Sequence, residues 1–210
     1  IGATFDFFDG MSARLLKVSS PIGKELDSLA DVVTFGVAPS TMIYYTLSVI
    51  DYPSFLQSPP QYSFDVYRTV IPYLAFLMAA FSALRLAKFN IDTRQTDSFI
   101  GLPTPANALF WGALILTNPY WIENNSWSLF CILALMLTSC YLLVCELPMF
   151  ALKFKHWTWK GNTIRYCFMI LTIVVLCLFG VLKGWWIVIA CYFLISLYLY
   201  ITGKSKRISK

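Results

Sequence analysis

Charged side chains are scarce in this 210-residue chain, where Asp, Glu, Lys and Arg make up only 13% of the residues. Soluble domains carry about 25% charged residues, so the composition argues against a soluble globular protein. Hydrophobic residues make up 58% of the chain, and the mean hydropathy is +0.66. Segments that span a bilayer are helices or closed barrels, and these apolar runs are too long and unalternating for barrel strands. The sequence predicts an all-α, polytopic transmembrane helical bundle.

Several catalytic and metal-binding signatures are missing. The chain has no G-x-S-x-G motif, no phosphate-binding P-loop and no C-x-x-C pair. All six cysteines fall in apolar stretches, which favours small hydrophobic side chains over disulfides or zinc ligands. The single histidine, His156, lies between Lys155 and Trp157, a setting typical of the membrane interface rather than of a catalytic group.

Apolar stretches divide the chain into about seven expected helices. They cover approximately residues 1–18, 23–50, 66–90, 103–120, 127–147, 163–182 and 185–202. We expect one membrane-embedded domain over residues 1–210, because no soluble domain or internal repeat is visible. The chain lacks an initiator methionine and has only five residues before Asp6, so we expect it to be N-terminally truncated.

Basic residues are distributed unevenly among the expected loops. When alternate loops are assigned to one side, that side collects fourteen of the sixteen Lys and Arg residues, and the other has Arg68 and Lys183. The positive-inside rule makes the basic side cytoplasmic. We therefore expect a multi-pass protein of the cell membrane. Its net charge of +5 is then a feature of the membrane surface and not of nucleic-acid binding.

Four carboxylates interrupt the apolar sequence near its start. Asp6 and Asp9 are three residues apart, and Asp27 and Asp31 are four apart, so on helices each pair shares a face. Close carboxylates repel each other and are costly to desolvate. Mg²⁺ offsets both effects because it prefers oxygen ligands. The spacing indicates a metal-dependent phosphoryl-type transfer site that opens to the cytoplasm, and a polar helix pair with solvated acids is the alternative.

The same stretch fits the pattern D-x-x-D-G-x-x-A-R-x8-G-x3-D-x3-D, with eight fixed residues in register over 26 positions. This pattern resembles the signature of the CDP-alcohol phosphotransferases. The segments FFDGMSARL, ELDSLADVVTFGVAPS, SALRLAKFN and FIGLPTPA look like the phosphatidylserine synthase branch of that family. The resemblance is specific from Phe5 to about Ala106, whereas the helices over residues 127–202 are less specific.

The resemblance implies a metal-dependent enzyme. It would transfer the phosphatidyl group from CDP-diacylglycerol to L-serine and release CMP. Two divalent cations, Mg²⁺ or Mn²⁺, are implied at Asp6, Asp9, Asp27 and Asp31, and Asp31 is also implied as the general base for the seryl hydroxyl. The residues implied at the CDP-lipid are Gly10, Ala13, Arg14 and Gly23. The family is often homodimeric, so a homodimer is implied as well.

The acceptor alcohol leaves weaker signals. Arg85, Lys88 and Asn90 end the expected third helix, and we interpret them as candidates for binding a serine carboxylate or a substrate phosphate. An ordinary positive-inside cluster is the alternative. Arg85 and Lys88 are three residues apart and would share a helix face. We interpret residues 99–106 as a rigid loop near the site.

Three functions stay open at this point. Serine is favoured as the acceptor because glycerol phosphate or inositol phosphate would need a denser basic pocket than one Arg and one Lys. Transfer to one of these phosphorylated alcohols is the second possibility. A cation pathway lined by the four acids is the third, and it is disfavoured because the acids cluster near one face of the membrane.

Overall fold

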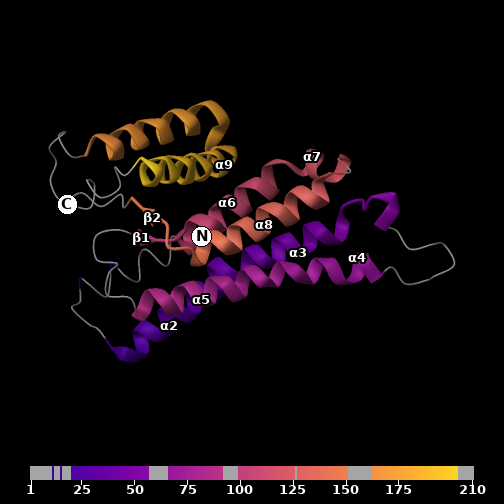
Figure 1. Cartoon of the computed structure of the whole chain (residues 1–210), viewed down its shortest axis with the longest axis horizontal. Helices are drawn as coiled ribbons and strands as arrows, with labels where there is room; N and C mark the ends of the chain where they lie inside the picture. Colours follow the sequence, from indigo (N-terminus) through magenta and orange to yellow (C-terminus); the bar gives the residue numbers. More distant parts are fainter. Residues whose placement is uncertain are drawn as a thin grey trace.

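The computed structural model describes residues 11, 15, 20–56, 66–91, 99–125, 127–150 and 162–202. These residues are almost entirely helical, and successive long helices run in opposite directions within one bundle (Figure 1). Within the described part of the chain, the helices that are long and apolar enough to cross a membrane are Pro21–Val49, Val66–Ile91 and Thr163–Ile201. The prediction of an all-α membrane protein is therefore confirmed. The expected helix over residues 1–18 and His156 lie almost wholly outside the described residues, so the number seven stays a prediction.

The first long helix consists of α2 (Pro21–Asp31), the π-helical η1 (Val32–Val37) and α3 (Ala38–Val49). Ser20 caps it, because its hydroxyl oxygen accepts a hydrogen bond from the backbone N–H of Gly23 at 2.9 Å. Pro21 occupies the first helical position, where a backbone N–H has no partner to lose. The helix thus begins at Pro21 and not at the expected Gly23, which lies inside its first turn.

The second long helix consists of α4 (Val66–Val70), the 3₁₀ segment η3 (Ile71–Phe76) and α5 (Leu77–Ile91). Two contacts fix its antiparallel register against the first helix. The side-chain amide of Asn90 donates to the hydroxyl of Ser28 at 3.0 Å. Gly36 lies eight residues after Ser28, and Ser82 lies eight residues before Asn90. A Cβ added to Gly36 would lie 3.0 Å from the Cβ of Ser82. Glycine at position 36 therefore lets the two backbones approach closely.

The expected fourth helix is split in two by a proline. The segments that follow α5 are α6 (Thr104–Thr117), α7 (Pro119–Asn124) and α8 (Ser128–Val144). Asn118 has non-helical φ −127° and ψ 39°, because Pro119 disfavours the helical conformation in the residue before it. The Asn118 amide donates to the carbonyl of Leu114 at 2.9 Å and so satisfies the end of α6.

The last element, α9 (Thr163–Ile201), folds back on itself as two antiparallel arms (Figure 1). The turn occurs at Gly180, whose φ of 79° and ψ of 159° are essentially restricted to glycine. We predicted the break at Lys183 and Gly184, and this position was wrong. A Cβ on Gly184 would lie 2.6 Å from Cδ2 of Leu176, so this glycine serves the close packing of the arms instead.

Two short strands, β1 (Phe99–Ile100) and β2 (Pro148–Met149), pair antiparallel with Phe99 opposite Met149. The sequence did not predict them. They tie the chain before α6 to the chain after α8. Gly101 follows β1 with φ 74°, and its N–H donates to the carbonyl of Leu147 at 2.9 Å. These ties brace residues 99–103, whereas residues 104–106, which we also expected in the rigid loop, form the first turn of α6.

Two apolar clusters hold the helices together. The larger one joins α3, α5, α6 and α8 around side chains that are fully buried, among them Ile43, Met78, Trp111 and Met136. The second packs α9 against β2 and Leu102, and it contains the aromatic rings of Phe150, Phe168 and Tyr192. The Tyr192 hydroxyl also donates to the Phe150 carbonyl at 2.8 Å. The second cluster therefore fixes α9 beside the start of α6.

Gly101→Ala is expected to destabilise the protein by about 1–3 kcal/mol, because it forces a side chain into the left-handed region. The new Cβ would also lie 2.9–3.1 Å from three carbonyl oxygens of residues 142, 143 and 145. Gly112→Ala is the matched control, since nothing lies within 4 Å of a Cβ there. It should stabilise α6 by roughly 0.5–1 kcal/mol. Melting temperatures in detergent would measure both, and equal shifts would contradict the expectation.

Candidate active site

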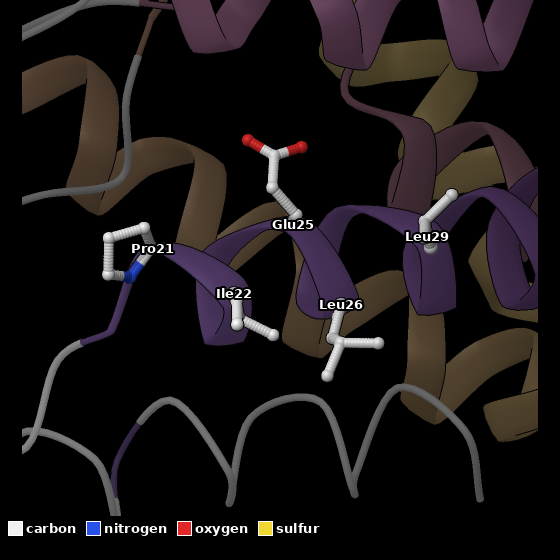
Figure 2. Close-up of a pocket in the computed structure, with 5 residues that line it drawn as sticks. All are labelled: Pro21, Ile22, Glu25, Leu26 and Leu29. Atoms are coloured by element: carbon white, nitrogen blue, oxygen red, sulfur yellow. The ribbon is translucent and has the colours of Figure 1, made fainter.

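The helix α2 carries the two described carboxylates of the motif. Asp27 is exposed and Asp31 is half-buried. Their spacing of four residues places them on one face of α2. The apolar side chains of Ile22, Leu26 and Leu29 recur at helical spacing, and with Pro21 and Glu25 they line a groove (Figure 2). The helix is thus amphipathic, with Asp27 and Asp31 on one face and this mostly apolar groove on another.

The C-terminal end of α5 lies against the carboxylate-bearing side of α2. The 3.0 Å hydrogen bond from Asn90 to Ser28 joins the two helices next to Asp27. Ser28 follows Asp27 and lies one turn before Asp31, so this bond fixes α5 against the part of α2 that carries both acids. The structure thus brings Asn90, a predicted acceptor-site residue, to the carboxylate motif. The bond makes Asn90 a residue that positions α2.

Among the predicted site residues that the structure describes, Arg85 is the most buried. Only 7% of its surface is exposed, and it lies within electrostatic range of Asp31 and Tyr192. The antiparallel register of the two helices places Arg85 level with Val33, which is two residues from Asp31. At a rise of roughly 1.5 Å per residue, this offset is about 3 Å along the helix axis. Its Nη1 donates to the hydroxyl of Thr104 at a long 3.5 Å. The site therefore has a buried cation beside a carboxylate.

The guanidinium group of Arg85 has a hydrogen-bond donor that is not used within the described structure. Its Nε has no hydrogen-bond partner among the described residues. The guanidinium carbon lies 5.7 Å from the ring centroid of Phe89, within the range of a cation–π contact. A buried guanidinium with unused donors is suited to bind a carboxylate or phosphate in a bidentate manner.

Lys88 has a different environment from Arg85, although we predicted that the two share a face. Its side chain is exposed, whereas Arg85 is buried. Three residues fall about 60° short of a full helical turn. Because of this offset, Arg85 lies on the side of α5 that faces the bundle and Lys88 lies on the side that does not. The two cations do not form a single pocket.

One buried stripe of α6 was missed by the sequence analysis. Thr104, Asn107 and Trp111 are fully buried and recur every three or four residues, so they face the same side. Trp111 is satisfied because its Nε1 donates to the hydroxyl of Ser139 at 3.1 Å. The two polar residues at i and i+3 in an otherwise apolar helix were the signal that could have found the stripe.

Asn107 stands out within this stripe. Neither its Oδ1 nor its Nδ2 has a hydrogen-bond partner among the described residues, although the side chain is 0% exposed. A buried amide has two donors and one acceptor to satisfy. Leaving such a group unpaired costs about 1–3 kcal/mol. The unpaired amide of Asn107 lies one helical turn from the contact between Thr104 and Arg85.

The described residues fit part of a divalent metal site. Asp27 and Asp31 offer the carboxylate oxygens that hard cations prefer, from one face of one helix. No group of three or more His, Cys, Asp or Glu side chains that could hold a metal occurs within the described ranges. The other predicted site residues lie outside the described part of the chain, and these are Asp6, Asp9, Gly10, Ala13 and Arg14.

Known proteins resemble this chain over its helical core. The family model for CDP-alcohol phosphatidyltransferases matches residues 1–196. The chain is 42% identical over 108 residues to a CDP-diacylglycerol–serine O-phosphatidyltransferase of Bacillus subtilis, which covers 50% of each chain. It is 40% identical over 129 residues to a protein of the same name from Helicobacter pylori, covering 60% of this chain and 48% of that relative. A Saccharomyces cerevisiae protein of that name is 37% identical over 134 residues, or 60% of this chain and 41% of the relative. The chain spans about half the length of the curated relatives it matches.

The contact between Ser28 and Asn90 predicts energetic coupling between α2 and α5. Ser28→Ala and Asn90→Ala should each destabilise the protein by about 1 kcal/mol, the usual value of a hydrogen bond. The double variant should cost less than the sum, because both substitutions remove the same interaction. Unfolding by SDS in mixed micelles would measure the cycle. Simple additivity would show that the two side chains do not interact.

Proposed function

Because the chain belongs to the CDP-alcohol phosphatidyltransferase family, we propose that it transfers a phosphatidyl group from CDP-diacylglycerol to L-serine and releases CMP. The observation that carries this proposal is the buried Arg85 beside Asp31, in a membrane protein whose curated relatives bear the name of that activity. A cation next to a carboxylate suits an acceptor that must present both a carboxylate and a hydroxyl to the reacting phosphorus.

In the proposed reaction the seryl oxygen forms a bond to the β-phosphorus, and the bond from that phosphorus to the bridging oxygen breaks. CMP leaves with the bonding electrons, and Asp31 accepts the proton of the seryl hydroxyl. Divalent cations bound by Asp6, Asp9, Asp27 and Asp31 would neutralise charge on the leaving phosphate. Mg²⁺ and Mn²⁺ both fit this oxygen donor set.

The CDP-lipid would bind along the first part of the motif. We propose that Gly10 and Ala13 leave space for the nucleotide and that Arg14 pairs with a phosphate. Gly23 has a more limited part, because it lies in the first turn of α2 and its N–H is bound to Ser20. It would provide close-approach space for the CDP-lipid at the N-terminus of α2.

The acceptor would bind between α5 and α6. Arg85 is the buried cation there and would pair with the serine carboxylate, while the exposed Lys88 would attract anionic substrates without contacting them. Glycerol phosphate and inositol phosphate are the alternative acceptors. A phosphomonoester carries more charge than a carboxylate, and a pocket in which Arg85 and Lys88 are separated suits it less well.

We further propose that the site opens to the cytoplasm from the cell membrane. Lys88 lies in the last turn of α5 and Arg165 in the first turn of α9, and these helix ends lie toward the end of the bundle where α2 begins (Figure 1). Arg68 lies in α4, toward the other end, and Lys183 follows the turn of α9 at Gly180. This distribution follows the positive-inside rule. A homodimer remains an expectation from the family resemblance.

The activity itself is tested by CMP release from CDP-diacylglycerol, using the full-length protein in detergent with Mg²⁺, Mn²⁺ or EDTA. L-serine, glycerol phosphate and inositol phosphate are compared as acceptors. We expect metal-dependent release with L-serine alone and a loss of at least about 10²-fold in Asp31→Asn, as for removal of a general base. Release with another alcohol would keep the chemistry and change the substrate. A folded, metal-loaded protein that releases no CMP with any acceptor would contradict the proposal.

The role of Arg85 is tested by comparing L-serine with ethanolamine, which lacks the carboxylate. Arg85→Gln should raise the KM for L-serine about 10- to 100-fold, since a charged hydrogen bond contributes roughly 1.5–3 kcal/mol. Its effect on ethanolamine turnover should be small, so the preference for serine should fall. Lys88→Gln is the control and should change this preference little, because Lys88 is exposed. Equal losses with both alcohols would assign Arg85 a structural role.

A further inference from the structure

We propose that Asn107 is a specificity-determining residue that binds the α-ammonium group of the acceptor amino acid through its side-chain oxygen Oδ1. This inference rests on the proposed function and adds the group that recognises the second charge of a zwitterionic acceptor. In the proposed function, Arg85 binds the carboxylate of the acceptor, and no residue is yet assigned to its ammonium group.

The position of Asn107 supports this role. Thr104 contacts Arg85 through the 3.5 Å hydrogen bond, and Asn107 lies one turn further along the same buried face of α6. The helix α6 packs against η1, the segment that directly follows Asp31. Asn107 therefore lies one turn from the residue that contacts the buried cation, on a helix that packs against the segment following Asp31.

The unpaired amide itself points to a ligand. Asn107 is 0% exposed, and both of its polar atoms lack a partner among the described residues. Buried side-chain amides are normally hydrogen-bonded. The next residue of the stripe, Trp111, shows that the interior supplies a partner where packing requires one, because its N–H is bound to Ser139. An acceptor that enters beside Arg85 would supply the missing partner to Asn107.

The charges of the described residues favour a neutral oxygen for this task. Asp27 and Asp31 are committed to metal and proton transfer in the proposed reaction. Of the other described acids, Glu25 and Glu146 are exposed, Asp51 follows α3 and Glu123 lies in α7, so none of them shares the buried face of α6 with Asn107. An amide oxygen accepts from an ammonium group without adding negative charge next to the site.

The test compares L-serine with 3-hydroxypropanoate, which keeps the hydroxyl and the carboxylate and lacks the ammonium group. The full-length enzyme is assayed for CMP release with its metal present, as wild type, Asn107→Leu and Asn107→Ala. We expect the KM for L-serine to rise about tenfold or more, as for loss of a hydrogen bond to a charged group. The KM for CDP-diacylglycerol should stay within about twofold, and the preference for L-serine over 3-hydroxypropanoate should fall by a similar factor of about ten.

Ser128→Ala is the matched control. Ser128 is also buried, its hydroxyl also lacks a partner among the described residues, and it begins α8 at the opposite end of the bundle (Figure 1). This variant should leave both KM values and the acceptor preference unchanged. Melting temperatures establish whether each variant is folded. If Asn107→Leu does not fold, the test uses Asn107→Ala.

The outcomes separate this inference from the proposed function. An unchanged KM for L-serine in a folded Asn107 variant would overturn the role of Asn107 while the enzyme still releases CMP. A parallel rise of both KM values, or a higher KM for L-serine with unchanged preference over 3-hydroxypropanoate, would also overturn it. A wild-type enzyme that fails to use L-serine would instead contradict the proposed function.

Discussion

The close antiparallel contact between α5 and the first long helix is the constraint on which the site depends. Gly36 has no side chain, so the backbone of η1 can approach Ser82, and the same register brings Asn90 to Ser28. The π-helical turn that contains Gly36 is compensated locally, because the Ser40 hydroxyl donates to the Gly36 carbonyl at 2.8 Å. This register is what sets Arg85 next to Asp31. A larger side chain at position 36 would move the cation away from the carboxylate.

Many buried polar groups of this bundle are satisfied inside the protein, as Trp111 is by Ser139 and the Thr46 hydroxyl is by the Met42 carbonyl. At the site, Arg85 and Asn107 keep atoms without partners among the described residues. Electrostatic interactions are stronger in a low-dielectric interior, so these unpaired groups are both costly to the fold and effective toward a charged ligand. The hydroxyls of Ser82 and Ser128 also lack partners among the described residues, but the larger unpaired groups, those of Arg85 and Asn107, lie on the neighbouring helices α5 and α6.

The start of α6 is fixed by contacts to two other parts of the bundle. The pairing of β1 with β2 and the left-handed Gly101 tie it to the end of α8, and the cluster of Phe150, Phe168 and Tyr192 anchors it to α9. Thr104 and Asn107 therefore sit on a braced segment. A site that must discriminate between small alcohols requires such rigidity, because a displacement of about 1 Å weakens hydrogen-bond selectivity.

The sequence by itself determined the features that depend on local chemistry. Long apolar runs specified membrane helices, Ser20 and Pro21 specified where α2 begins, and the spacing of Asp27 and Asp31 placed both acids on one face. Only the tertiary structure decided the features that depend on distant neighbours. It buried Arg85 and exposed Lys88, moved the α9 turn to Gly180, paired β1 with β2 and left Asn107 without a hydrogen-bond partner among the described residues. The physical reason is that helix formation follows from nearby residues, whereas burial and hydrogen-bond partners are set by segments that meet only when the bundle packs.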